Sequence, residues 1–121
     1  MILRDWSSDV CSSDLIKVTV KKKDNYIVDL KISGHANSDE YGKDLVCAGV
    51  STASIGTLNM LVKKDFLNRN LGTIEVDEGY INVVVNQVDD ICQVVLETLV
   101  VILETMVESY SQYIKISIME V

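Results

Sequence analysis

Polar and apolar residues alternate with a period of two in five segments of the chain, the pattern of half-buried β-strands. The first two segments are separated by the turn-like residues "KDN", and the third and fourth by "EG", so each pair predicts a β-hairpin. The predicted strands are 16–22 (IKVTVKK), 26–33 (YIVDLKIS), 72–77 (GTIEVD), 80–86 (YINVVVN) and 113–119 (YIKISIM).

Two other segments have the period of a helix. From Leu45 to about Lys63 the apolar positions recur near every 3.6 residues, and Asp44 lies where an N-cap is expected. The second helix is expected to begin at Asp89 and Asp90, whose carboxylates suit the positive end of a helix dipole, and to end near Tyr113.

The resulting element order, β-β-α-β-β-α-β, predicts an α+β fold with an antiparallel or mixed sheet and two helices packed on it. A length of 121 residues fits one domain, and the composition, 48% hydrophobic and 24% charged, is that of a folded protein. The second helix is apolar over more than one face, which indicates a homodimer, or else a helix deeply buried within one subunit.

The first fifteen residues are unlike the rest of the chain. The string "RDWSSDVCSSDL" is rich in Ser and Asp, has no periodicity, and resembles a translated adapter or cloning remnant. We therefore expect residues 1–15 to be a non-native leader and residues 16–121 to form the domain. Trp6 and Cys11 then have no functional role.

Charge and cysteine content narrow the function classes. The net charge is −7, and removing the −2 of the leader still leaves −5, so direct binding of nucleic acid is not expected. An acidic surface could instead attract a basic protein. Apolar runs broken by Glu97 and Glu104 are too short to cross a membrane. Three scattered cysteines fit a reducing cytoplasm, and together with one histidine they offer no zinc-ligand spacing, so a zinc site is not expected.

One segment, "GHANSDEYGKDLVCAGVS", combines groups suited to thiol chemistry. If Asp44 caps the helix, Cys47 lies in its first turn, where the dipole lowers a thiol pKa from its usual value of about 8.5. His35 follows the second strand, and an imidazole near the helix start would stabilise the thiolate and protonate a leaving amine. Ser51 lies one helical turn after Cys47, on the same face.

The loop before this helix is also expected to contact the substrate. Gly34 permits a close approach of backbone to ligand, and the polar stretch that includes Tyr41 and Gly42 could close over an extended substrate, with Gly42 as its hinge. The spacing alone also fits a plainer interpretation, in which Cys47 is a small buried side chain and His35 a surface residue. Cys92, in the apolar second helix, is expected to be structural.

The same residues resemble the signature of the bacterial ribosomal-processing cysteine proteases, the Prp family. "GHA" is followed by "YGKDLVCAGVS", and the similarity continues through "EVDEGYINVVV" to the C-terminal strand, over essentially residues 16–121. The resemblance implies a homodimeric Cys–His endopeptidase without cofactors. It implies Cys47 as nucleophile, His35 as general base and acid, Asp44 and Ser51 as supporting residues, and a mobile substrate loop.

The substrate that the resemblance implies is the precursor of a large-subunit ribosomal protein, whose N-terminal extension is removed during ribosome maturation. Two other interpretations stay open. A non-catalytic ribosome-assembly module could bind a peptide in the same groove without cleaving it. A thiol redox sensor would also use a reactive cysteine, although no resolving cysteine is near Cys47 in the sequence.

Overall fold

The computed structural model describes the backbone of residues 16–34, 41–77 and 80–121, and the side chains of these residues except 41–45. The predicted leader, His35 and the rest of segment 35–40 therefore lie outside the described residues. The elements follow the predicted order: β1 (Ile16–Lys23), β2 (Tyr26–Ser33), α2 (Tyr41–Lys63), β3 (Gly72–Asp77), β4 (Tyr80–Val85), α3 (Asp90–Tyr110) and β5 (Ile114–Glu120).

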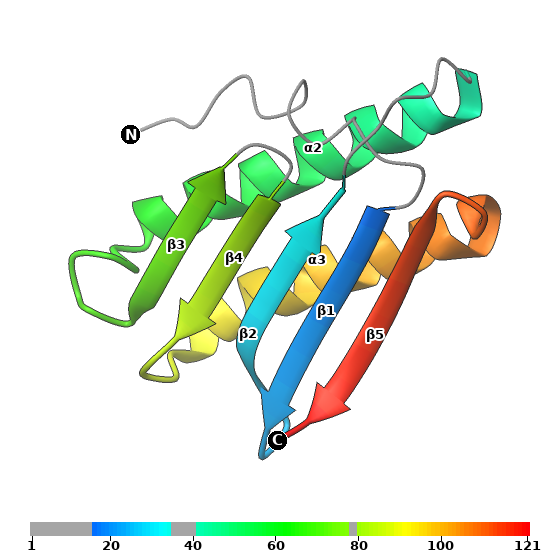
Figure 1. Ribbon diagram of the computed structural model, residues 1–121. Helices are drawn as coiled ribbons and strands as arrows, with labels where there is room; N and C mark the ends of the chain where they lie inside the picture. The colour runs from blue at the N-terminus through cyan, green and yellow to red at the C-terminus, as the bar shows by residue number, and fades with distance from the viewer. Residues whose placement is uncertain (1–15, 35–40, 78–79) are drawn as a thin grey trace.

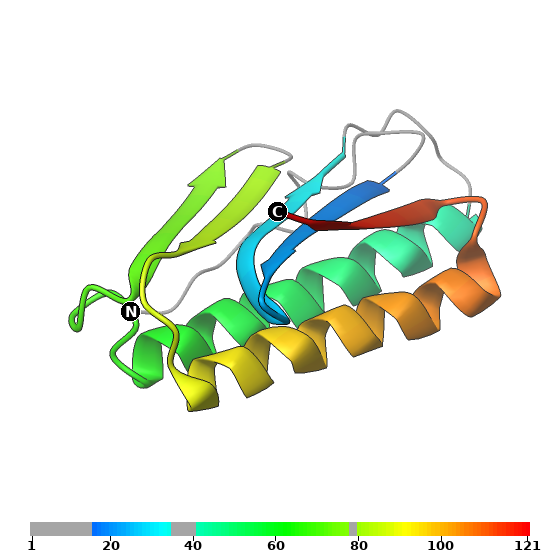
Figure 2. The same cartoon turned by 90° about the horizontal axis from the view of Figure 1, so that it is seen from below.

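The strands form one mixed sheet in the order β3-β4-β2-β1-β5 (Figure 1). Three pairings are antiparallel, and β5 lies parallel to β1, so the predicted α+β fold with an antiparallel or mixed sheet is confirmed in its mixed form. Both helices cover the same face of the sheet, which gives two layers (Figure 2). No helix in the described part of the chain is both long and apolar enough to cross a membrane.

The first hairpin turns at Asp24 and Asn25, which have positive φ angles of 54° and 69°. A tight turn that matches the twist of a hairpin requires two consecutive residues in the left-handed conformation. Apart from glycine, Asp and Asn are the residues that tolerate this conformation best. The register of β1 on β2 then shifts between Lys21 and Lys22. At this irregularity the side chain of Gln93 from α3 satisfies the backbone groups of Ile27. It accepts a hydrogen bond from the Ile27 amide and donates one to the Ile27 carbonyl, both 2.8 Å long.

The core lies between the sheet and the helix layer. Alternate strand residues face it, and from α2 a single stripe of side chains does so at helical spacing. The buried residues of this stripe are Val46, Cys47, Val50, Ser51, Ser54, Leu58 and Leu61.

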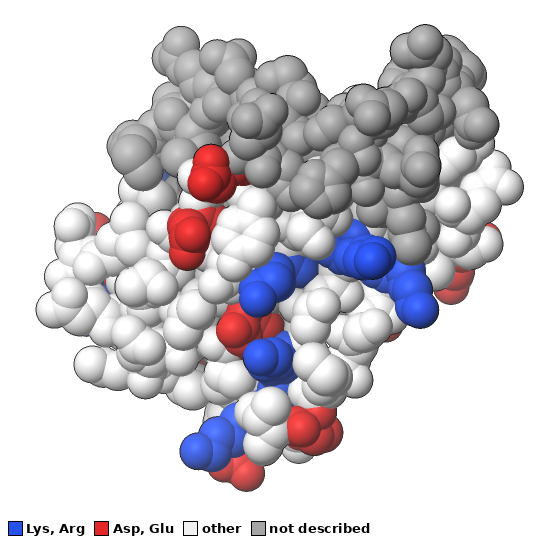
Figure 3. Space-filling view, viewed as in Figure 1, with Lys and Arg blue, Asp and Glu red and all other residues white. Residues whose placement is uncertain are grey.

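The open face of the sheet carries the opposite set of strand side chains. Four lysines project from β1, β2 and β5 there, and lysine side chains form a row across this face (Figure 3): Lys17, Lys21, Lys31 and Lys115. The Lys31 ammonium lies 5.9 Å from the centre of the Tyr80 ring, within the range of a cation–π contact. Exposed acidic groups lie on β3, at Glu75 and Asp77, and along α3, at Glu97, Glu104 and Glu108.

Candidate active site

Cys47 lies on α2 with its side chain fully buried in the core cluster. The helix carries it because its apolar positions recur along one face, and Cys47 occupies that face together with Val46 and Val50. Cys47 and Cys92 are both thiols in this structure. A buried position protects a nucleophile from water and oxidants, and it also means that substrate must reach Cys47 by displacing or passing its neighbours.

The first residues of α2 differ from the prediction. The helix begins at Tyr41 and not at Asp44, so Asp44 lies inside the helix and is not its N-cap. An acidic residue is favourable both at an N-cap and within the first turn, and the sequence pattern does not separate these positions. Cys47 is consequently the seventh helical residue, beyond the turn whose free amides would stabilise a thiolate.

The same shift corrects the predicted loop. Tyr41 and Gly42 belong to the first turn of α2, so Gly42 is not a hinge in the connection before the helix. Glycine costs about 1 kcal/mol relative to alanine in a helix interior, which is why the sequence suggested a loop. Gly34 is buried just beyond the end of β2, and His35 comes next in the chain. The connection from β2 to α2 begins at that point.

Ser51 is almost fully buried one helical turn after Cys47, and Ser54 is fully buried three residues further on. Neither hydroxyl has a hydrogen-bond partner among the described residues. Burial of an unsatisfied hydroxyl costs about 1–3 kcal/mol, so alanine would be the more stable choice at such a position. Four residues of an α-helix rise about 6 Å, so Ser51 and Cys47 lie on one face, where both side chains can line one site.

The second helix sets the position of this part of α2. A β-carbon placed on Gly49 would lie 2.9 Å from the Cε atom of Met106 in α3, so the absence of a side chain lets the helices approach closely near Cys47. The sequence analysis missed this contact. The small residues around Cys47, "CAG", were the only signal for it.

Cys92 shows the contrasting environment. It is buried in the first turn of α3, where its amide donates a 3.1 Å hydrogen bond to the capping carboxylate of Asp89. Burial, followed by the neighbouring Asp89, raises the pKa of the Cys92 thiol. A thiol whose pKa is raised stays protonated at neutral pH, which agrees with the structural role expected for Cys92.

Among the described residues, no three His, Cys, Asp or Glu side chains gather in a way that could hold a metal ion.

Comparison with known proteins identifies the family. The family model described as cysteine protease Prp matches residues 15–115. The ribosomal processing cysteine protease Prp of Staphylococcus aureus is 32% identical over 94 residues, which cover 75% of this chain and 86% of that protein. The Bacillus subtilis protein of the same name is 39% identical over 49 residues, 40% of this chain and 44% of that protein.

Solved structures agree. A protein of Streptococcus mutans superimposes with a TM-score of 0.72 at 25% identity, covering 89% of this chain and 97% of that one. The Staphylococcus aureus Prp in complex with a substrate peptide gives a TM-score of 0.70 at 29% identity, covering 86% and 99%. Sequence and fold together show that this chain belongs to the Prp family of cysteine proteases.

Proposed function

We propose that this protein is a Cys–His endopeptidase that removes the N-terminal extension of a large-subunit ribosomal protein precursor in the cytoplasm. The observation that carries the proposal is that Cys47 and Ser51 lie one helical turn apart on α2, and that the buried Ser51 hydroxyl has no hydrogen-bond partner among the described residues. Membership of the Prp family and the relatives named as ribosomal processing proteases support it.

The proposed chemistry is acyl transfer through a thioester. The Cys47 thiolate attacks the scissile carbonyl, the C–N bond breaks, and the imidazolium of His35 gives its proton to the leaving amine. His35 then takes a proton from water, whose oxygen attacks the thioester and releases the new carboxylate and the Cys47 thiolate. Since α2 begins six residues before Cys47, the thiolate depends more on His35 than on the helix dipole.

Supporting roles follow from position. We assign Ser51 to a hydrogen bond within the site, because its hydroxyl is buried without another described partner. Asp44, one turn before Cys47 on α2, is proposed to orient the site from the helix side. Gly34, Tyr41 and Gly42 flank segment 35–40 and are proposed to form the ends of a substrate loop.

Cleavage of a precursor protein tests the assignment. Reduced protein is incubated with a large-subunit ribosomal protein that carries its N-terminal extension, and the products are identified by intact mass. We expect one cut that removes the extension, full loss of cutting in Cys47→Ala, and an unchanged rate in the control Cys92→Ala. An intact precursor after prolonged incubation with the parent protein would refute the proposal.

One observation favours the second candidate, a non-catalytic peptide-binding module in ribosome assembly. Cys47 has no exposed surface, as expected for a packing residue. This alternative predicts that Cys47→Ala retains both precursor binding and cellular function. The cleavage experiment separates the two functions, because Cys47→Ala abolishes precursor cleavage by a protease but leaves a binding module functional.

We also propose a homodimer formed through the outer face of α3. Ile91, Val94 and Val101 are 56%, 62% and 59% exposed at a spacing of three and seven residues. Thr98 and Thr105 continue the stripe, and their hydroxyls bond the Val94 and Val101 carbonyls within the helix. The stripe therefore offers mainly apolar atoms at a 3.5-residue repeat, the pattern of paired helices. Sedimentation should show a dimer that Val94→Glu/Val101→Glu converts to a monomer.

The proposed domain is residues 16–121, with residues 1–15 as a non-native leader. The family model begins at residue 15, which supports this boundary. Deletion of residues 1–14 should leave the melting temperature unchanged or raise it. A large fall in melting temperature would show that the leader is part of the fold.

A further inference from the structure

A cavity of about 460 Å³ lies between α3 and β5, on the side of α3 away from α2. Its apolar lining comes from Val107 of α3 and from Ile116 and Ile118 of β5, and Ile118 is 46% exposed. Glu104 and Glu108 complete the lining, and both are exposed. Among the described residues, neither helix covers the outer side of β5, and the cavity lies in the space that is left there.

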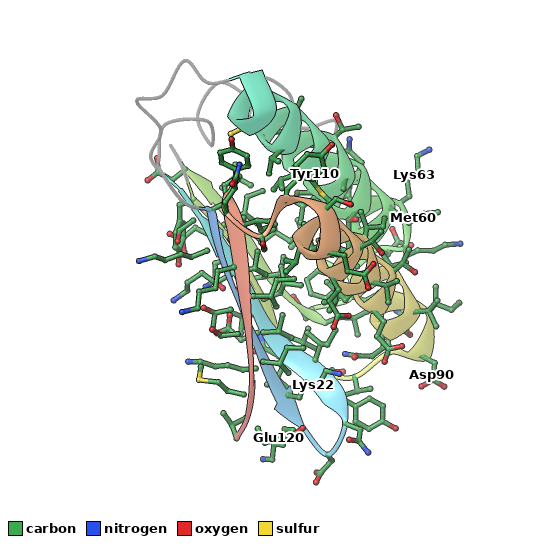
Figure 4. All side chains as sticks on the ribbon, turned by 90° about the vertical axis from the view of Figure 1, so that its right-hand side faces the viewer. Lys22, Met60, Lys63, Asp90, Tyr110 and Glu120 are labelled. Atoms are coloured by element: carbon green, nitrogen blue, oxygen red, sulfur yellow. The ribbon has the colours of Figure 1, made fainter. Side chains whose placement is uncertain are left out.

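β5 is an edge strand. It pairs with β1 on one side, and among the described residues no strand pairs with its other side. Figure 4 looks on to this edge, where β5 runs from the end of α3 near Tyr110 to Glu120. An edge strand presents backbone N–H and C=O groups that an extended chain can pair with.

The alternation of strand side chains connects the edge to the cavity. Ile116 and Ile118 face the helix layer. In a strand added beside β5, every second side chain would point to the same side of the sheet and therefore into the cavity. Long basic side chains fit this space best. Their methylene stems would cover Val107, Ile116 and Ile118, and their charged ends would reach Glu104 and Glu108. None of the described residues that line the cavity is basic.

Glu104 and Glu108 are four residues apart on one helix, where two like charges destabilise the helix by a few tenths of a kcal/mol. A bound cation between them would reverse this repulsion. A second copy of β5 would not provide one, because the side chains that it directs to the helix layer are Ile114, Ile116, Ile118 and Glu120. Charge complementarity therefore selects a basic peptide over self-pairing.

We propose that the β5 edge and this cavity form an accessory binding site for an extended, lysine- or arginine-rich peptide, added to the sheet as a sixth strand. Its identity as part of the substrate rests on the proposed function. Strands are about 4.8 Å apart, and a strand added outside β5 would lie three spacings, about 14 Å, from β2, which leads to His35. Roughly four extended residues span that separation. A basic segment near the scissile bond of the precursor would reach this site.

The test measures binding without catalysis. A fluorescein-labelled peptide of alternating valine and lysine, ten residues long, is titrated with the Cys47→Ala protein and followed by anisotropy. We expect saturable binding, and at least a ten-fold loss of affinity for a valine–glutamate peptide. Two further valine–lysine peptides carry N-methyl groups on every second amide, one on the odd-numbered and the other on the even-numbered residues. The peptide whose methyl groups block the hydrogen bonds to β5 should lose affinity by a similar factor.

Protein variants locate the site. Glu104→Lys/Glu108→Lys should weaken binding at least ten-fold, whereas Glu75→Lys/Asp77→Lys, with the same charge change at exposed positions of β3 on the opposite edge of the sheet, should change it less than two-fold. Equal weakening by both pairs, or full binding by both N-methylated peptides, would overturn the proposal, because the attraction would then be non-specific charge. Absence of binding, or a protein dimer that the peptide cannot displace from this edge, would also overturn it.

The outcome is independent of proteolysis. Binding in the Cys47→Ala background with no precursor cleavage by the parent protein would leave the accessory site standing and refute the protease proposal. Cleavage without peptide binding would do the reverse.

Discussion

Gly49 of α2 lies directly against the end of the Met106 side chain of α3. A β-carbon added at Gly49 would not fit unless the methionine moved. This contact joins the two helices two residues after Cys47. The position of the proposed nucleophile therefore depends on α3 as well as on the sheet beneath α2.

Alanine substitutions at two glycines of α2 test this dependence. At Gly56 no described atom lies within 4 Å of an added β-carbon, so Gly56→Ala should stabilise the protein by about 1 kcal/mol through helix propensity. Gly49→Ala should gain less, because Met106 must move, and should lower kcat/KM for the precursor. Urea unfolding and cleavage rates measure both effects. Recovery in Gly49→Ala/Met106→Ala would confirm the coupling, and equal behaviour of the two single variants would contradict it.

Ser51 and Ser54 form a second matched pair. Both hydroxyls are buried without a described partner, so alanine at either position should leave stability unchanged or raise it by about 1 kcal/mol. Only Ser51→Ala should reduce kcat/KM, by roughly ten-fold if its hydroxyl takes part in general acid–base chemistry. If Ser54→Ala loses as much activity as Ser51→Ala, the role assigned to Ser51 is wrong.

Gln93 should be among the most sensitive polar residues for folding. Its amide satisfies both backbone groups of Ile27, and removing it leaves a buried donor and a buried acceptor unpaired. We expect Gln93→Ala to lower the free energy of unfolding by about 2–4 kcal/mol, whereas the exposed Gln87→Ala should change it by less than about 0.5 kcal/mol. A loss at Gln93 no larger than that at Gln87 would mean that water replaces the amide.

The Asp89 cap predicts an acid dependence. The hydrogen bond from the Cys92 amide holds the pKa of the Asp89 carboxyl below its usual 3.8, against the opposing effect of desolvation. Because the folded-state pKa is lowered, the stabilisation is present above the unfolded pKa and is lost as the pH falls through the folded one. Asn also caps a helix but does not titrate, so Asp89→Asn should gain stability relative to the parent below about pH 4. Parallel urea midpoints for the two proteins from pH 7 to pH 3 would rule this out.

The sequence was sufficient for the element order, because alternation and helical spacing follow directly from which side chains are buried. It did not determine how β5 pairs. A strand such as "IKISI" alternates in the same way whether its neighbour is parallel or antiparallel, and the partner is chosen by the route of the chain across α3.

The start of α2 could not be located from sequence for a similar reason. Tyr41 and Gly42 are poor helix formers, and Asp44 is favourable at several positions near a helix start. The β5 edge site escaped notice because Glu104, Glu108 and Ile118 are far apart in the chain and are brought together only by the packing of α3 on β5.

The central claim is that Cys47 is a nucleophile activated by His35. Alkylation by iodoacetamide as a function of pH, followed at each cysteine by peptide mass spectrometry, tests it in the parent and in His35→Ala. We predict that Cys47 reacts with an apparent pKa below about 8.5 that rises when His35 is removed, while Cys92 reacts only at higher pH in both proteins. A Cys47 profile that is identical in the two proteins and matches that of Cys92 would contradict the account.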